Sequence, residues 1–340
     1  MRKFYSLALM SLIAILSSQV TFAQGEADPG NVNSSTEGAL NGLFTINANG
    51  DQVQFSQGNL QYQASTKTWR FADDQTKYLD RAANIKVSPD NTTWIDLFGW
   101  GTGNNPTLAT TDAADYATFT DWGVNAISNG GNQPNQWRTL SSEEWMYLLH
   151  ERQNAEEKVG FGTAKRMKGL IILPDEFTLP QEAGVPYLFY SIKDKNFSWM
   201  SSSEYYYNAS KDNYSHNTYD VEQWSNMESA GAVFLPVTGL RIGTEMDYVS
   251  NTGFYWTSSA KDATHSYSMR ITQQELMPFS YGSPSSGHGV RLVLGGDNNA
   301  ETTLDRLNVS TANAQKIVRD GQVFILRDGK TYNLLGAEVK

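Results

Sequence analysis

The fold is decided by GAVFLPVTGLRIG (231–243), GFYWTSSA (253–260), SYSMRI (266–271) and GHGVRLVLG (287–295), four short stretches in the last third of the chain. Each stretch is a short apolar strand, and the loops between them are rich in Ser, Tyr, Asn, Gly and His. This pattern predicts a rigid sheet whose loops present polar and aromatic groups to solvent, as binding surfaces do. We therefore expect recognition of a ligand rather than catalysis.

The N-terminus has the pattern of an export signal. Arg2 and Lys3 precede an apolar run over residues 4–15, and the small-residue pattern Thr21-Phe22-Ala23 follows. A basic start, an apolar stretch of about 7–15 residues and a small-x-small site are typical of secretory signals. We predict a signal peptide at 1–23 and a secreted or cell-surface protein. A membrane anchor would need about 20 apolar residues, so no membrane span is expected.

Composition narrows the class of protein further. The chain has 340 residues, no cysteine and a net charge of -10. An exported protein without disulfides must be held by a large packed core. The acidic balance argues against nucleic acid as a partner, because phosphate binding needs clustered Lys and Arg. Charged residues make up 18% and aromatic residues 12%, which favours a folded, β-rich chain over a disordered one.

The chain divides into five predicted regions. They are the signal peptide 1–23, a polar linker 24–40, a main domain 41–295, a second linker 296–312 and a C-terminal β-hairpin tail 313–340. In the tail, Asp328-Gly329 suits a tight turn between two strands. Since a two-stranded hairpin is marginal in water, the tail must dock, pair with another chain or serve as a signal.

Local signals place several elements in the main domain. Asn49-Gly50 predicts a hairpin turn, and NLQYQ (59–63) with TWRFA (68–72) predicts a second hairpin. Ser141 and Glu144 have the spacing of a capping box that opens a helix. A shorter helix is predicted at 221–229 and a strand at 168–174. Few helices, many short strands and long loops indicate an α+β fold.

Five patterns also occur in an order that resembles a known family. They are WRTLSSEEWMYLL (137–149), GLIILPDEF (169–177), ESAGAVFLPVTGLR (228–241), FYWTSS (254–259) and GVRLV (289–293). Together they resemble the C-type lectin-like fold of the formylglycine-generating enzyme and variable-protein branch. The resemblance implies a C-type lectin-like domain with short twisted antiparallel strands, two helices and long irregular loops.

The resemblance also implies a ligand-binding surface near the end of the domain. The residues that it assigns to this surface are Tyr255, Trp256, Ser258, Ser259, His265, Tyr267, Tyr281, Ser283, Ser286 and His288. Tyr and Trp offer rigid contact area, while Ser adapts its hydrogen bonds. Trp256 lies in an apolar strand and suits the core as well as a contact, whereas we expect His265 and His288 to be exposed.

Enzymatic members of the branch use cysteines at a bound copper, so their activity does not carry over to a chain without cysteine. Two segments partly match the calcium-binding motifs of true C-type lectins, namely Gln133-Pro134-Asn135 and Trp224-Ser225-Asn226. We interpret both as turns. The four histidines lack metal-ligand spacing. We expect no cofactor, no metal site and no catalytic residue.

The tail resembles another family. KIVRDGQVFILRDGKTYNLLGAEVK (316–340) resembles C-terminal modules of exported bacterial proteins that use a type IX secretion route. We therefore consider two interpretations of this segment, a secretion signal and a small hairpin packed on the main domain.

The sequence therefore predicts an exported, adhesin-like module that binds an extracellular protein or glycan without catalysis. Two alternatives stay open. One is a secreted carbohydrate-active enzyme with acidic catalytic residues, for which Asp121, beside Trp122, and Asp247, beside Tyr248, are the candidate acids. The other is a structural envelope component.

Overall fold

The computed structural model describes residues 36–193 and 214–296, together with the backbone of β11 (Ser198–Ser201), β12 (Tyr205–Asn208) and four strands of the C-terminal tail. The predicted signal peptide lies outside the described residues, as do most of the first linker and the second linker after Gly296. The described part contains three α-helices and several small, mainly antiparallel sheets. The predicted α+β class is confirmed.

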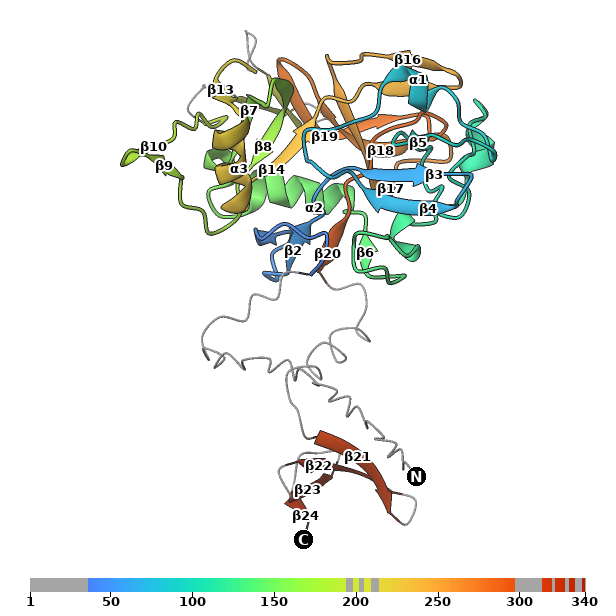
Figure 1. Ribbon diagram of the computed structural model, residues 1–340, viewed down its shortest axis with the longest axis vertical. Helices are drawn as coiled ribbons and strands as arrows, with labels where there is room; N and C mark the ends of the chain where they lie inside the picture. The colour runs from blue at the N-terminus through green and yellow to red at the C-terminus, as the bar shows by residue number, and fades with distance from the viewer. Residues whose placement is uncertain are drawn as a thin grey trace, which may run out of the picture. The chain divides into compact units, whose positions relative to one another are not determined.

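The described part of the main domain contains four sheets of three or more strands, and Figure 1 shows how their strands are arranged. The first has the order β1-β2-β20-β6 (Phe44–Thr45, Gln52–Phe55, Val293–Gly295, Trp137–Arg138). The second has the order β4-β3-β5 (Thr68–Phe71, Leu60–Gln63, Trp94–Ile95). The third has the order β13-β7-β8-β14 (Asn217–Tyr219, Val159–Ala164, Met167–Ile172, Val233–Pro236). The fourth has the order β11-β12-β19-β18-β17 and contains Glu275–Gly282, Ser266–Ile271 and Gly253–Ala260 as its last three strands.

Short hairpins and helices complete the domain. The hairpins are β9-β10 (Gln181–Glu182, Val185–Pro186) and β15-β16 (Leu240–Ile242, Glu245–Asp247). The α-helices are α1 (Arg81–Asn84), α2 (Ser142–Met146) and α3 (Val221–Ser229). A π-helical turn, η3 (Tyr147–Glu151), continues α2, and the 3-10 turns are η1 (Ala113–Tyr116), η2 (Trp122–Val124) and η4 (Ala155–Glu157).

The two longer helices begin where local sequence signals place them. The Ser141 hydroxyl accepts a bond from the Glu144 N–H at 3.1 Å, and the Glu144 carboxylate accepts one from the Ser141 N–H at 2.7 Å. This reciprocal pair is the predicted capping box. Asp220 and Gln223 form an equivalent box at the start of α3. The predicted helix at 221–229 is confirmed with the same bounds.

The predicted hairpins are also present. Asn49 and Gly50 lie in the turn between β1 and β2, and Gly50 has a φ of 86°, which favours glycine. β3 pairs antiparallel with β4 as expected. The domain begins earlier than position 41, because Leu40 is buried and its N–H donates to the Phe55 carbonyl at 2.8 Å.

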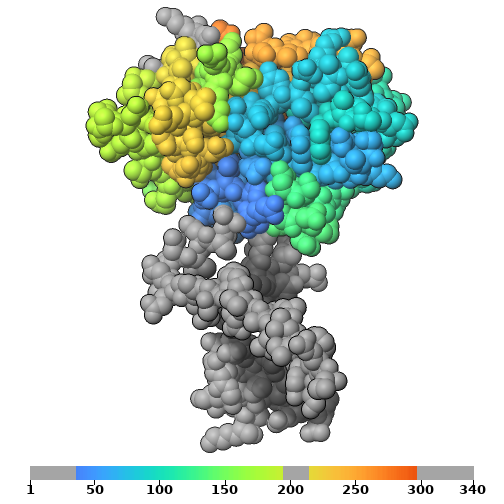
Figure 2. Space-filling model, viewed as in Figure 1, coloured from blue at the N-terminus to red at the C-terminus, as the bar shows by residue number. Residues whose placement is uncertain are grey.

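The start and end of the main domain are joined in one sheet. β20 lies between β2 and β6, and it pairs antiparallel with both of them (Figure 1). Segments that are distant in sequence also meet on the surface, where the region of α1 lies beside that of β16 (Figure 2). There the Tyr78 and Ser250 hydroxyls are hydrogen-bonded at 2.9 Å.

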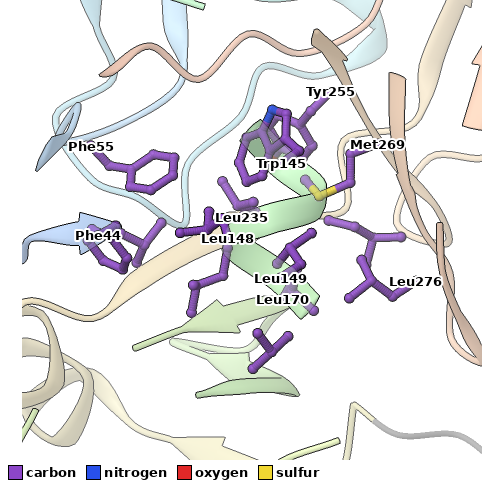
Figure 3. Packing of buried hydrophobic residues seen from close by; sticks show 14 of the residues in the cluster. Phe44, Phe55, Trp145, Leu148, Leu149, Leu170, Leu235, Tyr255, Met269 and Leu276 are labelled. Atoms are coloured by element: carbon purple, nitrogen blue, oxygen red, sulfur yellow. The ribbon is translucent and has the colours of Figure 1, made fainter. Parts of the chain in front are cut away.

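The largest hydrophobic cluster surrounds α2 (Figure 3). Trp145 is 1% exposed and packs against Phe55 with ring centroids 5.6 Å apart. The cluster brings α2 and η3 together with apolar residues of β8, β14, β18 and β19, namely Leu170, Ile172, Val233, Leu235, Met269, Ile271 and Leu276. This helix therefore connects the third and fourth sheets.

A buried arginine links further parts of the domain. Arg291 is 2% exposed and donates to the Asn59 side chain and to the carbonyls of Ser56 and Phe234. A buried guanidinium must have its N–H groups paired. The acceptors therefore tie two segments, residues 56–59 and the strand of Phe234, to the segment that carries Arg291. The Val-Arg pattern of the sequence thus belongs to the core.

The C-terminal tail forms its own sheet. β21 (Ala314–Arg319), β22 (Gln322–Arg327), β23 (Lys330–Asn333) and β24 (Glu338–Val339) are antiparallel neighbours in that order. The prediction of a two-stranded hairpin was therefore incomplete, because it missed the two outer strands. The turn at Asp328-Gly329 lies outside the described residues. Four strands have more capacity for independent stability than two.

Among the described residues, no helix has the length and apolar character needed to cross a membrane.

Replacing Trp145 by alanine tests the role of α2 in the core. We expect a loss of about 3–5 kcal/mol in the free energy of unfolding, because a large buried ring leaves a cavity. Tyr248→Ala is the control, since that side chain is 52% exposed, and it should change stability by less than about 0.5 kcal/mol. Denaturant unfolding measures both, and an unchanged midpoint for Trp145→Ala would contradict this packing.

Candidate binding surface

The predicted binding residues centre on three consecutive antiparallel strands, β17, β18 and β19. Tyr267 of β18 lies directly opposite Tyr281 of β19, and Ser268 lies opposite Ser280. Directly opposed residues place their side chains on the same face of a sheet. The sheet therefore brings the two tyrosines together although 13 residues separate them in the chain.

The pairing of β18 with β19 is irregular between Ser268 and Arg270, where β19 has one extra residue. Met269 and Ile271 are buried on the side of α2, while Tyr267 and Arg270 are half-buried. Such a bulge changes the direction of the side chains along that strand. Tyr267 lies two residues before Met269, beyond the buried part of the sheet, and we call Tyr267 together with Phe279 and Tyr281 of β19 the outer face.

Aromatic contacts run along the outer face. The Phe279 and Tyr267 rings meet edge to face, with centroids 5.7 Å apart. The Tyr281 ring contacts the His265 ring at 5.5 Å, and the Lys261 ammonium lies 3.0 Å from the Tyr281 centroid. Tyr281 is 40% exposed. The result is an exposed aromatic row whose rings hold one another in place.

The loop before β18 is ordered by its own hydrogen bonds. The Asp262 carboxylate accepts from the Thr264 N–H at 2.8 Å and lies 3.0 Å from His265 Nδ1. Backbone N–H groups of Lys261 and Asp262 both donate to the His265 carbonyl. Hydrogen bonds from Thr264 and His265 lower the pKa of Asp262 to about 2, so this carboxylate stays ionised beside the aromatic row.

A groove adjoins the outer face at Phe279. Its volume is about 570 Å³, and it is lined by Ile46, Asn47, Ala48, Glu143, Glu144, Met146, Tyr147, His150, Glu151 and Phe279. We call it the α2 groove. Ser259 connects it to β17, because the Ser259 hydroxyl donates to the Glu143 carboxylate at 3.3 Å and accepts from the Ser142 N–H at 3.1 Å.

Three of the ten predicted residues are buried. Tyr255, Trp256 and His288 are 0%, 1% and 2% exposed. The Tyr255 hydroxyl donates to the Pro236 carbonyl and the Trp256 indole to the Phe98 carbonyl, both at 2.7 Å. Their polar atoms are thus satisfied inside the protein, and these two residues belong to the core.

His288 corrects the expectation that this histidine is exposed. Its ring stacks on Trp256 with centroids 3.9 Å apart and on Phe254 with centroids 5.0 Å apart. Its backbone pairs with Phe98 on a neighbouring segment. Burial, and then the charge of Arg241, lower the pKa of His288 to about 3. The ring is a neutral core element at pH 7.

The other seven predicted residues are not buried. Tyr267 and Tyr281 belong to the aromatic row, His265 contacts Tyr281, and Ser259 lies beside Glu143. Ser258 is half-buried, and its N–H donates to the Leu140 carbonyl. Ser283 and Ser286 lie in the turn after β19, where the Ser283 carbonyl accepts from the Ser286 N–H.

Three further residues, Phe279, Tyr147 and Glu143, lie at this surface and were not predicted from the sequence. Phe279 precedes Tyr281 by two residues, and this strand periodicity was the signal that could have placed both rings on one face. Glu143 and Tyr147 come from α2 and η3, so only the tertiary packing of the helix brings them to β19.

The acids considered for catalysis do not converge. Asp121 accepts from the Gly123 and Thr139 N–H groups and caps η2, a structural role. Asp247 is exposed on β16. In the described part of the chain, no group of three or more His, Asp or Glu side chains could hold a metal ion.

Comparison with protein-family models, with curated proteins and with solved structures finds no match to this chain.

The buried state of His288 predicts a pH effect on stability. Because its folded pKa lies near 3 and its unfolded value near 6.5, the unfolded state binds a proton first as pH falls. The stability that a neutral His288 contributes is therefore present above about pH 6.5 and decreases as pH falls toward 3. His288→Phe keeps an aromatic ring without a titrating group. Denaturant unfolding between pH 7.5 and 4.5 should show a steeper loss for the unmodified protein, and parallel curves would contradict this assignment.

Proposed function

We propose that this chain is an exported recognition module with a C-type lectin-like domain, and that it binds an extracellular protein or glycan through the outer face of β17–β19. The observation that carries the proposal is the aromatic row of Phe279, Tyr267 and Tyr281, in which Tyr281 is exposed, Phe279 and Tyr267 are half-buried, and ring contacts fix the side chains. Rigid Tyr side chains supply contact area at a low cost in conformational entropy.

The fold supports this function because some residues of β17–β19 stabilise the core while others are left to contact a ligand. The buried sides of β17–β19 pack on α2, so the outer face rests on a rigid element rather than on a long loop. Rings held on a rigid support lose little freedom when a partner binds. The groove beside Phe279 adds a concave region next to the row of rings.

Recognition also fits the observations better than glycoside hydrolysis does. That chemistry requires two carboxyl groups about 5–10 Å apart across a cleft. Asp121 is committed to backbone N–H groups, and Asp247 lies on a separate hairpin. The basic and apolar N-terminal residues support export. For the C-terminal tail we propose either a role in secretion or a role as a small sheet packed on the main domain.

Alanine at Tyr281 or Tyr267 tests the proposal. Each should weaken binding by about tenfold or more, because exposed rings at the centre of an interface carry much of its affinity. The thermal midpoint should stay unchanged for Tyr281→Ala. A glycan array and a pull-down from cell surfaces identify the ligand, and titration of the purified ligand measures the loss.

Tyr248→Ala is the matched control, since it removes another exposed tyrosine, from the connection between β16 and β17, without touching the outer face. Wild-type affinity in both outer-face variants would show that the binding surface lies elsewhere.

A further inference from the structure

The α2 groove has carboxylates on one wall. Glu143 and Glu151 are exposed along the helix, and Glu144 lies between them in sequence. Arg138 pairs with Glu144 through two hydrogen bonds of 2.8 and 2.7 Å, which neutralises that carboxylate. Two acids, Glu143 and Glu151, are left facing the groove without an arginine or lysine among the described residues that line it.

The other titratable groups do not offset this charge. Partial burial lowers the pKa of His150, against the opposing effect of Glu156 and Glu151, so the imidazole is neutral at pH 7. For Glu143, burial opposes ionisation, but hydrogen bonds to its backbone N–H and to nearby hydroxyls, Ser259 included, hold its pKa below the usual value. The groove is therefore negative at neutral pH.

The remaining lining is apolar or aromatic. Ile46 and Met146 contribute aliphatic surface, while Tyr147 and Phe279 contribute rings. Ring faces attract cations, and long cationic side chains bury their aliphatic stems on apolar surface. The protein already makes this contact on the neighbouring strands, where the Lys261 ammonium lies over the Tyr281 ring.

We propose that the α2 groove binds a basic peptide segment of a protein partner, with Lys or Arg stems on Phe279 and Tyr147 and their cations at Glu143 and Glu151. The inference rests on the proposed function, since Phe279 belongs to both the groove and the outer face. It selects a protein over a glycan, because a neutral sugar leaves two carboxylates without a counter-charge and an acidic sugar is repelled.

The test uses two end-blocked, fluorescently labelled peptides of seven residues, one alternating Lys with Leu and the other alternating Glu with Leu. Anisotropy titration of the protein should show saturable binding of the lysine peptide alone. Glu143→Gln and Glu151→Gln should each weaken it by about tenfold, the usual size for a lost charge-assisted contact. Phe279→Ala should also weaken it.

Glu222→Gln provides the matched control, because it removes one exposed carboxylate from α3, outside the groove. This variant should bind the lysine peptide as the unmodified protein does. Equal losses in Glu222→Gln and Glu143→Gln would reveal general attraction to an acidic protein and overturn the proposal. Equal binding of both peptides, or no binding of the lysine peptide, would also overturn it.

The outcome separates this inference from the proposed function. Suppose that a natural ligand loses affinity with Tyr281→Ala but keeps it with Glu143→Gln and Glu151→Gln. Recognition by the outer face would then stand, and the basic-peptide assignment of the groove would be wrong.

Discussion

The packing of α2 against the buried side of β17–β19 is the constraint on which the rest of the domain depends. Trp145, Leu148 and Leu149 contact a cluster that includes Met269, Ile271 and Leu276. Burial of these side chains removes a large apolar area from water, which is the main source of stability in a chain without cysteine. It also fixes where the first turn of the helix, with Glu143, stands relative to β19.

This arrangement explains how one set of strands serves both stability and binding. Met269 and Ile271 of β18 belong to the cluster around α2, while Tyr267, nearer the start of the strand, is half-buried beside Phe279. Aromatic residues then divide by environment. Trp256 and His288 stack inside the protein, whereas the Tyr281 ring reaches solvent beside Lys261.

Elements with local causes were predictable from the sequence. Capping boxes placed α2, and the Asn-Gly turn placed the β1–β2 hairpin, because each depends on residues a few positions apart. The site was only partly predictable. The apolar pattern at 266–271 located the strand that carries Tyr267, whereas the strand that carries Tyr281 was not predicted. The burial of His288 depends on stacking with Trp256 and pairing with Phe98, which local sequence does not reveal. The groove depends on contacts between α2 and β19 and was equally hidden.

The central claim is that Tyr267 and Tyr281 face outward to a ligand while Tyr255 and His288 stay in the core. Hydroxyl-radical footprinting with mass spectrometry, carried out on the protein alone and bound to its ligand, tests it most directly. The account predicts that Tyr281 and Tyr267 are oxidised in the free protein and protected in the complex, with Tyr255 and His288 unreactive in both. Reactive Tyr255 and His288, or outer-face tyrosines whose oxidation is the same with and without ligand, would contradict it.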